Sequence, residues 1–239
     1  MCTPPSPFLP PGESPSAAAE GDSPQDIIFL VDSTGSVEET EFNDLKGFLQ
    51  KYASRLEEQG YLGRSQTRMG VVTWGHTGEP VRVQFPLDMH FTNTSLQGAI
   101  EAIPFVMGST ARPDLGTTLE FLVDAFAGDF GARSYADHTA VLFVDSLPLN
   151  DVRIPVSRVK DANIILYVIG VHEGTVSQSL VDIVSTLEEF GTDTATTGIE
   201  STALASFATV SSDLFVDRLV RHLREWCELP STTLQTLAQ

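Results

Sequence analysis

Two aspartates, Asp32 and Asp145, each follow an apolar run of the sequence. Five consecutive apolar residues, Ile27 to Val31, lead into the first, and the run Thr139 to Val144 leads into the second. Runs of this kind, without polar alternation, are typical of strands that are buried on both faces of a parallel sheet. Since open α/β sheets bind ligands at the carboxyl ends of their strands, we predict that both carboxylates lie at that edge.

Hydroxyl side chains follow the first of these aspartates. Thr34 and Ser36 lie within four residues of Asp32, and Gly35 between them permits a tight turn that points side-chain oxygens inward. One carboxylate together with neutral oxygens suits a hard divalent cation such as Mg²⁺. The predicted metal ligands are therefore Asp32, Thr34, Ser36 and Asp145.

The stretch Asp32-Ser33-Thr34-Gly35-Ser36 resembles the metal-ion-dependent adhesion site of the von Willebrand factor A domain, which begins Asp-x-Ser-x-Ser after the first strand. Thr34 replaces the first serine and keeps a hydroxyl ligand. The region from Asp145 to Asp151 is similar to the family's Asp-Gly-x-x-x-Asp region, with Ser146 in place of the glycine. The resemblance covers about residues 25 to 227. It implies a bound Mg²⁺, or Mn²⁺ or Ca²⁺, whose open position takes an Asp or Glu carboxylate from a partner.

A third loop, from Gly108 to Gly116, departs from the family's Thr-x-Thr-Gly pattern. Counting back from Gly116 puts Pro113 at the ligand threonine and Asp114 beside it, whereas Thr110 is the equivalent if three residues have been inserted. Thr110 would leave the site with two carboxylates, and Asp114 would add a third and weaken the pull on an acidic partner. A loop that contributes nothing, in a degraded site, is the third alternative.

Strand patterns alternate with helix patterns along the chain. This predicts an α/β fold, a doubly wound and mostly parallel central sheet with one antiparallel edge strand, flanked by helices. The antiparallel pair follows from the turn Gly75-His76-Thr77-Gly78 between two strands. Beyond the two runs above, strands are expected at residues 68–74, 81–87, 163–171 and 204–210. Helices are expected at residues 37–59, 95–103, from 117 onward, 152–162, 176–190 and 213–226, with 192–202 as a loop.

The first helix has a start signal. Ser36 with Glu39 fits a capping box, so Ser36 serves as a helix cap, a metal ligand or both. For the last helix, Ser212 or Asp213 is the expected cap. His76 is expected to be an exposed loop residue, because no Cys or second His lies nearby at metal-binding spacing.

Three segments follow from composition. Residues 1–24 are rich in Pro, Ser, Ala and Glu, so a flexible leader is expected. Residues 25–229 form the predicted von Willebrand factor A-like domain, and residues 230–239 a polar tail. The 239 residues suffice for one α/β domain with a full core.

Charge and cysteine content limit the partners and the location. The 14 basic and 32 acidic residues give a net charge of -18, which argues against nucleic acid, and no apolar run approaches the ~18 residues that span a bilayer. Asn93-Thr94-Ser95 matches an N-glycosylation acceptor. The pair Cys2 and Cys227 resembles the terminal disulfide of some extracellular von Willebrand A domains, or it is two unrelated thiols. A secreted protein or an ectodomain is expected.

Three functions fit these features. The first is a non-enzymatic extracellular adhesion module that holds an acidic group of a matrix or cell-surface protein through its cation. The second is a matrix or mineral-associated structural protein with weak calcium binding and a degraded metal site. A magnesium-dependent phosphotransferase is the third, but it needs a second Asp where Thr34 stands, and the chain has no phosphate-binding loop or Gly-x-Ser-x-Gly motif.

Overall fold

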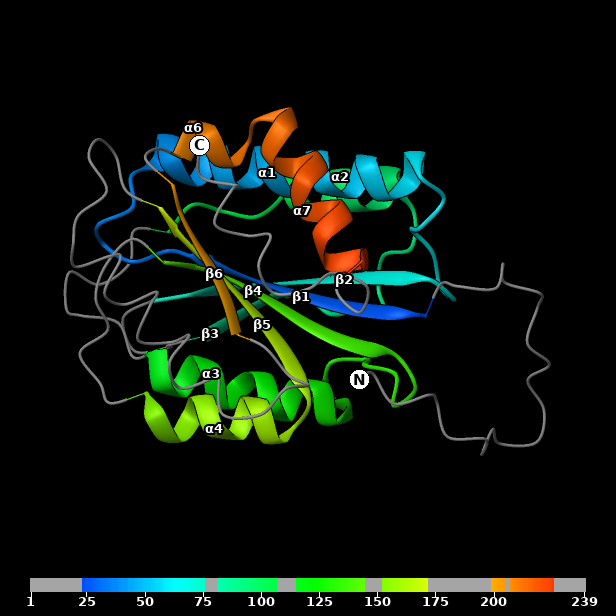
Figure 1. Cartoon of the computed structure of the whole chain (residues 1–239). Helices are drawn as coiled ribbons and strands as arrows, with labels where there is room; N and C mark the ends of the chain where they lie inside the picture. Colours follow the sequence, from blue (N-terminus) through cyan, green and yellow to red (C-terminus); the bar gives the residue numbers. More distant parts are fainter. Residues whose placement is uncertain are drawn as a thin grey trace.

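A six-stranded sheet forms the centre of the molecule, with strands in the order β3-β2-β1-β4-β5-β6 (Figure 1). The computed structural model describes residues 23–75, 81–106, 115–144, 152–171, 199–204 and 207–225. The strands are β1 (Gln25–Asp32), β2 (Thr67–Trp74), β3 (Val81–Phe85), β4 (Asp137–Val144), β5 (Ile164–Val171) and β6 (Ile199–Leu204). Neighbouring strands of this sheet pair in parallel, except that the edge strand β3 is antiparallel to β2. The predicted doubly wound sheet with one antiparallel edge strand is confirmed.

Helices cover both faces of this sheet. They are α1 (Glu39–Glu58), α2 (Asn93–Glu101), α3 (Leu115–Asp124), the π-helical turn η1 (Ala125–Asp129), α4 (Arg153–Asp161), α6 (Phe207–Val210) and α7 (Asp213–Glu225). Figure 1 shows α1, α2, α6 and α7 on one face, with α3 and α4 on the other. Because both faces of β1 are covered, all eight of its residues are buried.

The two faces of the sheet belong to two separate apolar clusters. Ile27, Phe29 and Val31 pack toward α1, where Phe48 and Tyr52 meet the ring of Phe29 at centroid distances of 5.9 and 5.1 Å. The alternate residues Ile28 and Leu30 belong to the cluster that includes α3 and α4. This alternation is the strand periodicity that fixes the register of β1 and, with it, the position of Asp32.

The start of α1 corrects the predicted capping box of Ser36 and Glu39. The N-cap is Glu38, in an extended conformation, and its backbone N–H donates to the Glu41 Oε2 atom at 2.6 Å. Val37 is buried, with 2% of its surface exposed, and it precedes the N-cap, so it belongs to the loop and not to the helix. Ser36 is therefore left to the loop that follows Asp32.

Other helix starts are close to the prediction. Thr92 caps α2, and its hydroxyl accepts a hydrogen bond from the Ser95 N–H at 3.3 Å, so the helix begins earlier than expected. The Ser212 hydroxyl accepts from the Phe215 N–H at 3.3 Å, which confirms the predicted cap of α7. Pro155 lies in the first turn of α4, where its missing N–H costs no helical bond.

The C-terminal part differs most from the prediction. The expected loop 192–202 is wrong at residues 199–202, which belong to β6 (Ile199–Leu204), and its residues 192–198 lie outside the described part of the chain. The expected strand 204–210 is wrong, because α6 covers Phe207–Val210. The apolar positions 207 and 210 are three residues apart, a spacing that fits a helix better than a strand. The predicted helix 176–190 lies outside the described residues.

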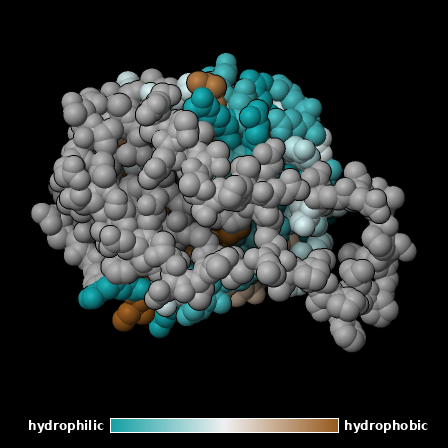
Figure 2. All heavy atoms as spheres, in the orientation of Figure 1, coloured by the Kyte–Doolittle hydropathy of each residue, from teal (hydrophilic) through white to brown (hydrophobic). Residues whose placement is uncertain are grey.

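On the face shown in Figure 2 the described surface is mainly hydrophilic with isolated hydrophobic spots. Within the described ranges, the exposed large hydrophobic side chains are Val83, Met89, Tyr135, Ile154 and Leu214, which come from separate segments of the chain. None of the described helices is long and apolar enough to cross a membrane.

Candidate metal centre

Asp32 is the last residue of β1, and only 1% of its surface is exposed. The backbone N–H of Thr34 donates to the Asp32 Oδ1 atom at 2.8 Å, which is the side-chain-to-backbone bond of an Asx turn. The Ser33 N–H donates to the Trp74 carbonyl at 3.0 Å and so extends the pairing of β1 with β2 by one residue. The chain therefore turns back over the carboxylate directly after the strand.

The two predicted hydroxyl ligands lie side by side. Thr34 Oγ1 and Ser36 Oγ are 2.9 Å apart, Thr34 is 2% exposed, and Ser36 is exposed. Ligands at right angles around Mg²⁺, at metal–oxygen distances near 2.1 Å, stand about 3 Å from each other. The hydroxyl pair therefore has the separation of two adjacent octahedral ligands. One carboxylate and two hydroxyls are also the oxygen donors that this ion prefers.

The end of β2 supports the hydroxyl loop from the side. Gly75 has a φ of 90°, and a Cβ atom at this position would lie 2.4 Å from Thr34 Cγ2 and 3.2 Å from the Thr34 backbone. Only glycine tolerates both this conformation and this close approach. The sequence pattern placed Gly75 in a hairpin turn and gave no sign of its contact with Thr34.

Replacing Gly75 by alanine is expected to weaken Mn²⁺ binding about tenfold and to lower the free energy of unfolding by about 1–3 kcal/mol, because the backbone strain adds to a displaced Thr34. Titration calorimetry and urea denaturation measure the two effects. Gly60→Ala is the matched control, because Gly60 also has a positive φ, of 75°, but a Cβ atom there would meet nothing within 4 Å. That variant is expected to lose stability and keep its metal affinity; equal metal affinities in the two variants would contradict the role of the Thr34 contact.

The loop that carries Thr110 and Asp114 starts beside this turn. The Ser33 hydroxyl donates to the carbonyl of Val106 at 2.9 Å, and Val106 is the last described residue before that loop. Thr110 and Asp114 themselves lie outside the described residues. Which of them, if either, approaches the cation therefore stays a prediction.

Asp145 comes directly after Val144, the last residue of β4, and also lies outside the described residues. β4 pairs with β1 in parallel, and Leu30 is opposite Leu142. Two residues beyond this pair, β1 ends at Asp32 and β4 ends at Val144. The topology thus brings the two strand ends, which are more than a hundred residues apart in sequence, to the same edge of the sheet.

The structure places the other predicted site residues elsewhere or leaves them undescribed. Among the described residues no group of three or more His, Cys, Asp and Glu side chains is arranged to hold a metal ion, and Asp32 is the one carboxylate of the predicted set in this part of the chain. Cys2, Cys227 and His76 fall outside the described ranges. Asn93 lies at the start of α2, where its Nδ2 donates to Ser54 Oγ at 3.3 Å.

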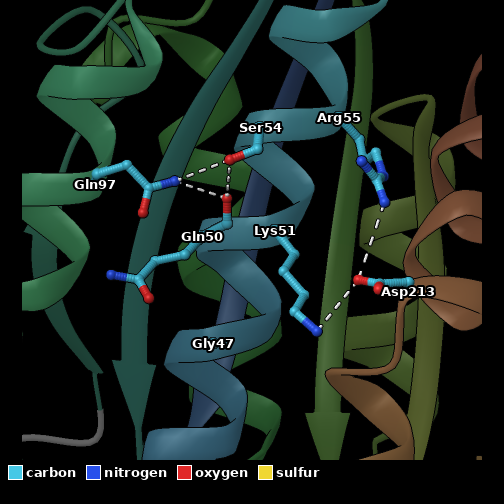
Figure 3. Close-up of a pocket in the computed structure, with 7 residues that line it drawn as sticks. All are labelled: Gly47, Gln50, Lys51, Ser54, Arg55, Gln97 and Asp213. Atoms are coloured by element: carbon cyan, nitrogen blue, oxygen red, sulfur yellow. Dashed lines mark hydrogen bonds and ion pairs between the residues drawn. The ribbon is translucent and has the colours of Figure 1, made fainter.

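A cleft of about 300 Å³ lies between α1, α2 and α7 (Figure 3). Gln97 of α2 donates to the carbonyl of Gln50 at 2.8 Å and to Ser54 Oγ at 3.2 Å, and Lys51 of α1 pairs with Asp213 of α7 at 3.2 Å. These polar and charged groups form their hydrogen bonds and their ion pair with one another, across the three helices. We therefore assign the cleft a structural role, which is to fasten α2 and α7 to α1.

The chain is an open α/β domain with a carboxylate and two hydroxyls at the carboxyl edge of its sheet. Within this class, the family model for the von Willebrand factor type A domain matches residues 26–204. The chain belongs to this family, as its sequence resemblance indicated.

Curated relatives include human collagen alpha-5(VI), 27% identical over 157 residues, and mouse matrilin-3, 28% identical over 149 residues. The matches span 66% and 62% of this chain but only 6% and 30% of those proteins.

Among solved structures, one similar protein is proximal thread matrix protein 1 from the mussel byssus, whose metal-ion-dependent adhesion site (MIDAS) motif is occupied by zinc. It has a TM-score of 0.65 at 21% identity, over 85% of this chain and 48% of that one. The pilus adhesin SpaC from Lactobacillus rhamnosus GG has a TM-score of 0.62 at 11% identity, over 85% of this chain and 31% of that one. At these low identities, the two similarities show a shared fold only.

Proposed function

We propose that this chain is an extracellular, non-enzymatic binding module that holds an acidic group of a protein partner at a divalent cation. The observation that carries the proposal is the turn after β1, where the Asp32 carboxylate accepts from the Thr34 N–H and the Thr34 and Ser36 hydroxyls lie 2.9 Å apart. Relatives among collagen chains and matrilins support a role in the matrix and an extracellular location. Partners are expected to present Asp or Glu, and the cation is expected to be Mg²⁺, Mn²⁺ or Ca²⁺.

Each residue of the site has a separate task in this proposal. Asp32 and Asp145 would supply two negative charges, which at most neutralise a divalent cation, while Thr34 and Ser36 would supply neutral oxygens. The bound cation supplies an open coordination position for one oxygen of the partner. Ser36 is exposed, so the outward side of the hydroxyl pair is accessible to that partner. Thr110 or Asp114 would complete the site, and Thr110 would leave it more attractive to an acidic group.

A matrix role without a specific metal site is the second candidate, because the net charge of -18 favours weak binding of many cations. Titration with Mg²⁺, Mn²⁺ and Ca²⁺ separates the two candidate functions. One tight Mg²⁺ or Mn²⁺ site that is lost in Asp145→Ala supports adhesion. Many weak calcium sites that are indifferent to this change support the second candidate.

Binding to an immobilised acidic ligand is expected to require the cation. A surface coated with a peptide that contains a single Glu is expected to retain the protein in millimolar Mg²⁺, to release it in EDTA, and to retain it again when Mg²⁺ is restored. The same peptide with Gln is the control. Retention in EDTA, or equal retention on the Gln peptide, would contradict the mechanism. Phosphatase activity that is lost in Asp32→Asn would instead favour the phosphotransferase.

The disulfide of Cys2 with Cys227 and the glycan on Asn93 stay predictions. A glycan on Asn93 replaces one of its two amide hydrogens, so the remaining N–H would have to keep the bond to Ser54. Mass spectrometry before and after reduction, and before and after glycosidase treatment, tests both modifications.

A further inference from the structure

Arginine and aromatic side chains gather at the amino-terminal ends of the strands, on the edge of the sheet opposite the metal centre. Arg64 precedes β2, Arg68 lies near its start, Phe91 precedes α2, and Tyr135 precedes β4. We call these four residues the arginine cluster. In a chain with 14 basic and 32 acidic residues, such a gathering of positive charge is unusual.

The two guanidinium groups of the cluster share one aromatic ring. The Cζ atoms of Arg64 and Arg68 lie 4.3 and 5.5 Å from the centroid of the Phe91 ring. Arg68 is further fixed because its Nε donates to the Arg64 carbonyl at 3.0 Å and its Nη1 to the Gly131 carbonyl at 3.2 Å. Arg68 is therefore held in place before any ligand arrives, which lowers the entropy lost on binding.

The charge of these two arginines is not neutralised within the described part of the chain. Neither Arg64 nor Arg68 forms an ion pair there, whereas the neighbouring Arg133 is paired with Asp26 at 2.7 Å. Burial lowers the pKa of Arg68, and the positive charge of Arg133 lowers it further, while Asp26 acts in the opposite direction. An anion that approached from solvent would relieve this repulsion.

Apolar surface lies beside the charges. Tyr135 is 55% exposed, and its ring centroid is 5.8 Å from the Arg133 Cζ atom. Phe91 is half-buried beneath the guanidinium groups. A ligand that fits this surface carries a carboxylate for the guanidinium forks and an apolar or aromatic group for the rings. An acidic peptide has both.

A long sulfated polysaccharide fits less well. Such a chain needs an extended row of basic residues, and the net charge of -18 repels a polyanion along the rest of the surface. A short acidic segment of a protein presents its charge only where the cluster is.

We propose that the arginine cluster is a docking surface for an acidic peptide segment of a protein partner, separate from the metal centre. A carboxylate of the segment lies between Arg64 and Arg68, and a neighbouring apolar side chain packs on Tyr135. The domain would then hold partners at both edges of its sheet, one through a cation and one through guanidinium groups.

The test uses the full chain in EDTA, so that the metal centre does not contribute. The probe is the acetylated peptide Glu-Glu-Phe-Glu-Glu, titrated by calorimetry in low salt, with the Gln-Gln-Phe-Gln-Gln peptide as its control. Arg64→Gln is expected to weaken the binding about tenfold, the effect of losing one charged hydrogen bond. Arg64 donates no hydrogen bond to the described protein through its guanidinium, so this variant is expected to fold normally. Arg64→Lys keeps the charge but loses the two-pronged guanidinium donor. Its affinity for the Glu peptide is expected to lie between that of the unmodified protein and that of Arg64→Gln.

Arg158→Gln is the matched control, because Arg158 lies on α4 and already pairs with Glu120 at 3.0 Å. Its affinity for the peptide is expected to equal that of the unmodified protein. The proposal is overturned if the Glu peptide does not bind, if Arg64→Gln and Arg158→Gln weaken binding equally, or if a heparin hexasaccharide binds more tightly than the peptide. Because EDTA is present throughout, these outcomes do not depend on the cation-dependent function proposed above.

Discussion

Replacing Arg133 by methionine is expected to lower the free energy of unfolding by about 3–5 kcal/mol, which is the cost of leaving a buried charge without its partner. Arg133 is 6% exposed and Asp26 is fully buried. The Arg133 Nη2 and Nε atoms both donate to Asp26 Oδ1, at 2.7 and 3.0 Å, and the Arg133 backbone N–H donates to Oδ2 at 2.6 Å. Methionine fills a similar volume but leaves the carboxylate without these side-chain donors.

The guanidinium of Arg133 also joins two backbone segments. It donates to the carbonyls of Gln25, Arg64 and Gln66 at 3.0, 3.2 and 2.6 Å, so it connects the start of β1 with the turn before β2. In the variant these three carbonyls also lose the hydrogen bond from Arg133, and of the three the Arg64 carbonyl still accepts from Arg68 Nε at 3.0 Å. The expected loss therefore lies at the upper end of the range.

Guanidinium chloride denaturation measures this effect. Arg158→Met is the surface control, and its expected change is within about 0.5 kcal/mol because Arg158 is 61% exposed in its pair with Glu120. The double variant D26N/R133M is expected to recover part of the loss, because it no longer buries an unpaired negative charge while the asparagine oxygen still accepts from the residue 133 N–H. A loss below about 1 kcal/mol in Arg133→Met would show that the pair does not hold this edge together.

Replacing Asp32 by asparagine is expected to weaken Mn²⁺ binding at least a hundredfold, because the change removes one of the two predicted negative charges from the cation while the side chain keeps its shape. The Oδ1 atom that accepts from the Thr34 N–H is retained, so the turn should persist. At a Mn²⁺ concentration of 100 times its Kd, the unmodified protein is expected to gain about 2.7 kcal/mol in its free energy of unfolding. The variant is expected to gain almost nothing.

Calorimetry and thermal unfolding with and without Mn²⁺ measure these two quantities. Asp161→Ala removes an exposed carboxylate at the end of α4 and is expected to leave both unchanged. Thr34→Val keeps the shape of the side chain and removes one hydroxyl, so an intermediate loss of affinity is expected. A Kd within threefold of the unmodified value in Asp32→Asn would exclude Asp32 as a ligand.

The expectations that rest on local patterns agree best with the fold. The strands β1, β4 and β5 lie where unbroken apolar runs predicted them, because burial on both faces requires apolar side chains at every position. The edge strand β6 was misplaced. A strand that is paired on one side only needs a less continuous apolar pattern, and the apolar residues just after β6 belong to the helix α6.

For the candidate metal centre, the sequence alone determined the residue types and their order. An apolar run, a carboxylate and closely spaced hydroxyls are properties of a short stretch of chain, and so these residues suffice to predict the turn after β1. Asp145, Thr110 and Asp114 remain predictions.

Only the tertiary structure decided which distant residues support that turn and hold the opposite edge of the sheet. Gly75, directly after β2, leaves no room for a Cβ atom beside Thr34, and the side chain of Asp26 binds Arg133, 107 residues away in the sequence. A local sequence pattern does not predict such contacts, because they depend on the order and register in which the strands pair. In this protein the short-range sequence specifies the candidate ligands, and the pairing of β1 with β2 and β4 brings their surroundings together.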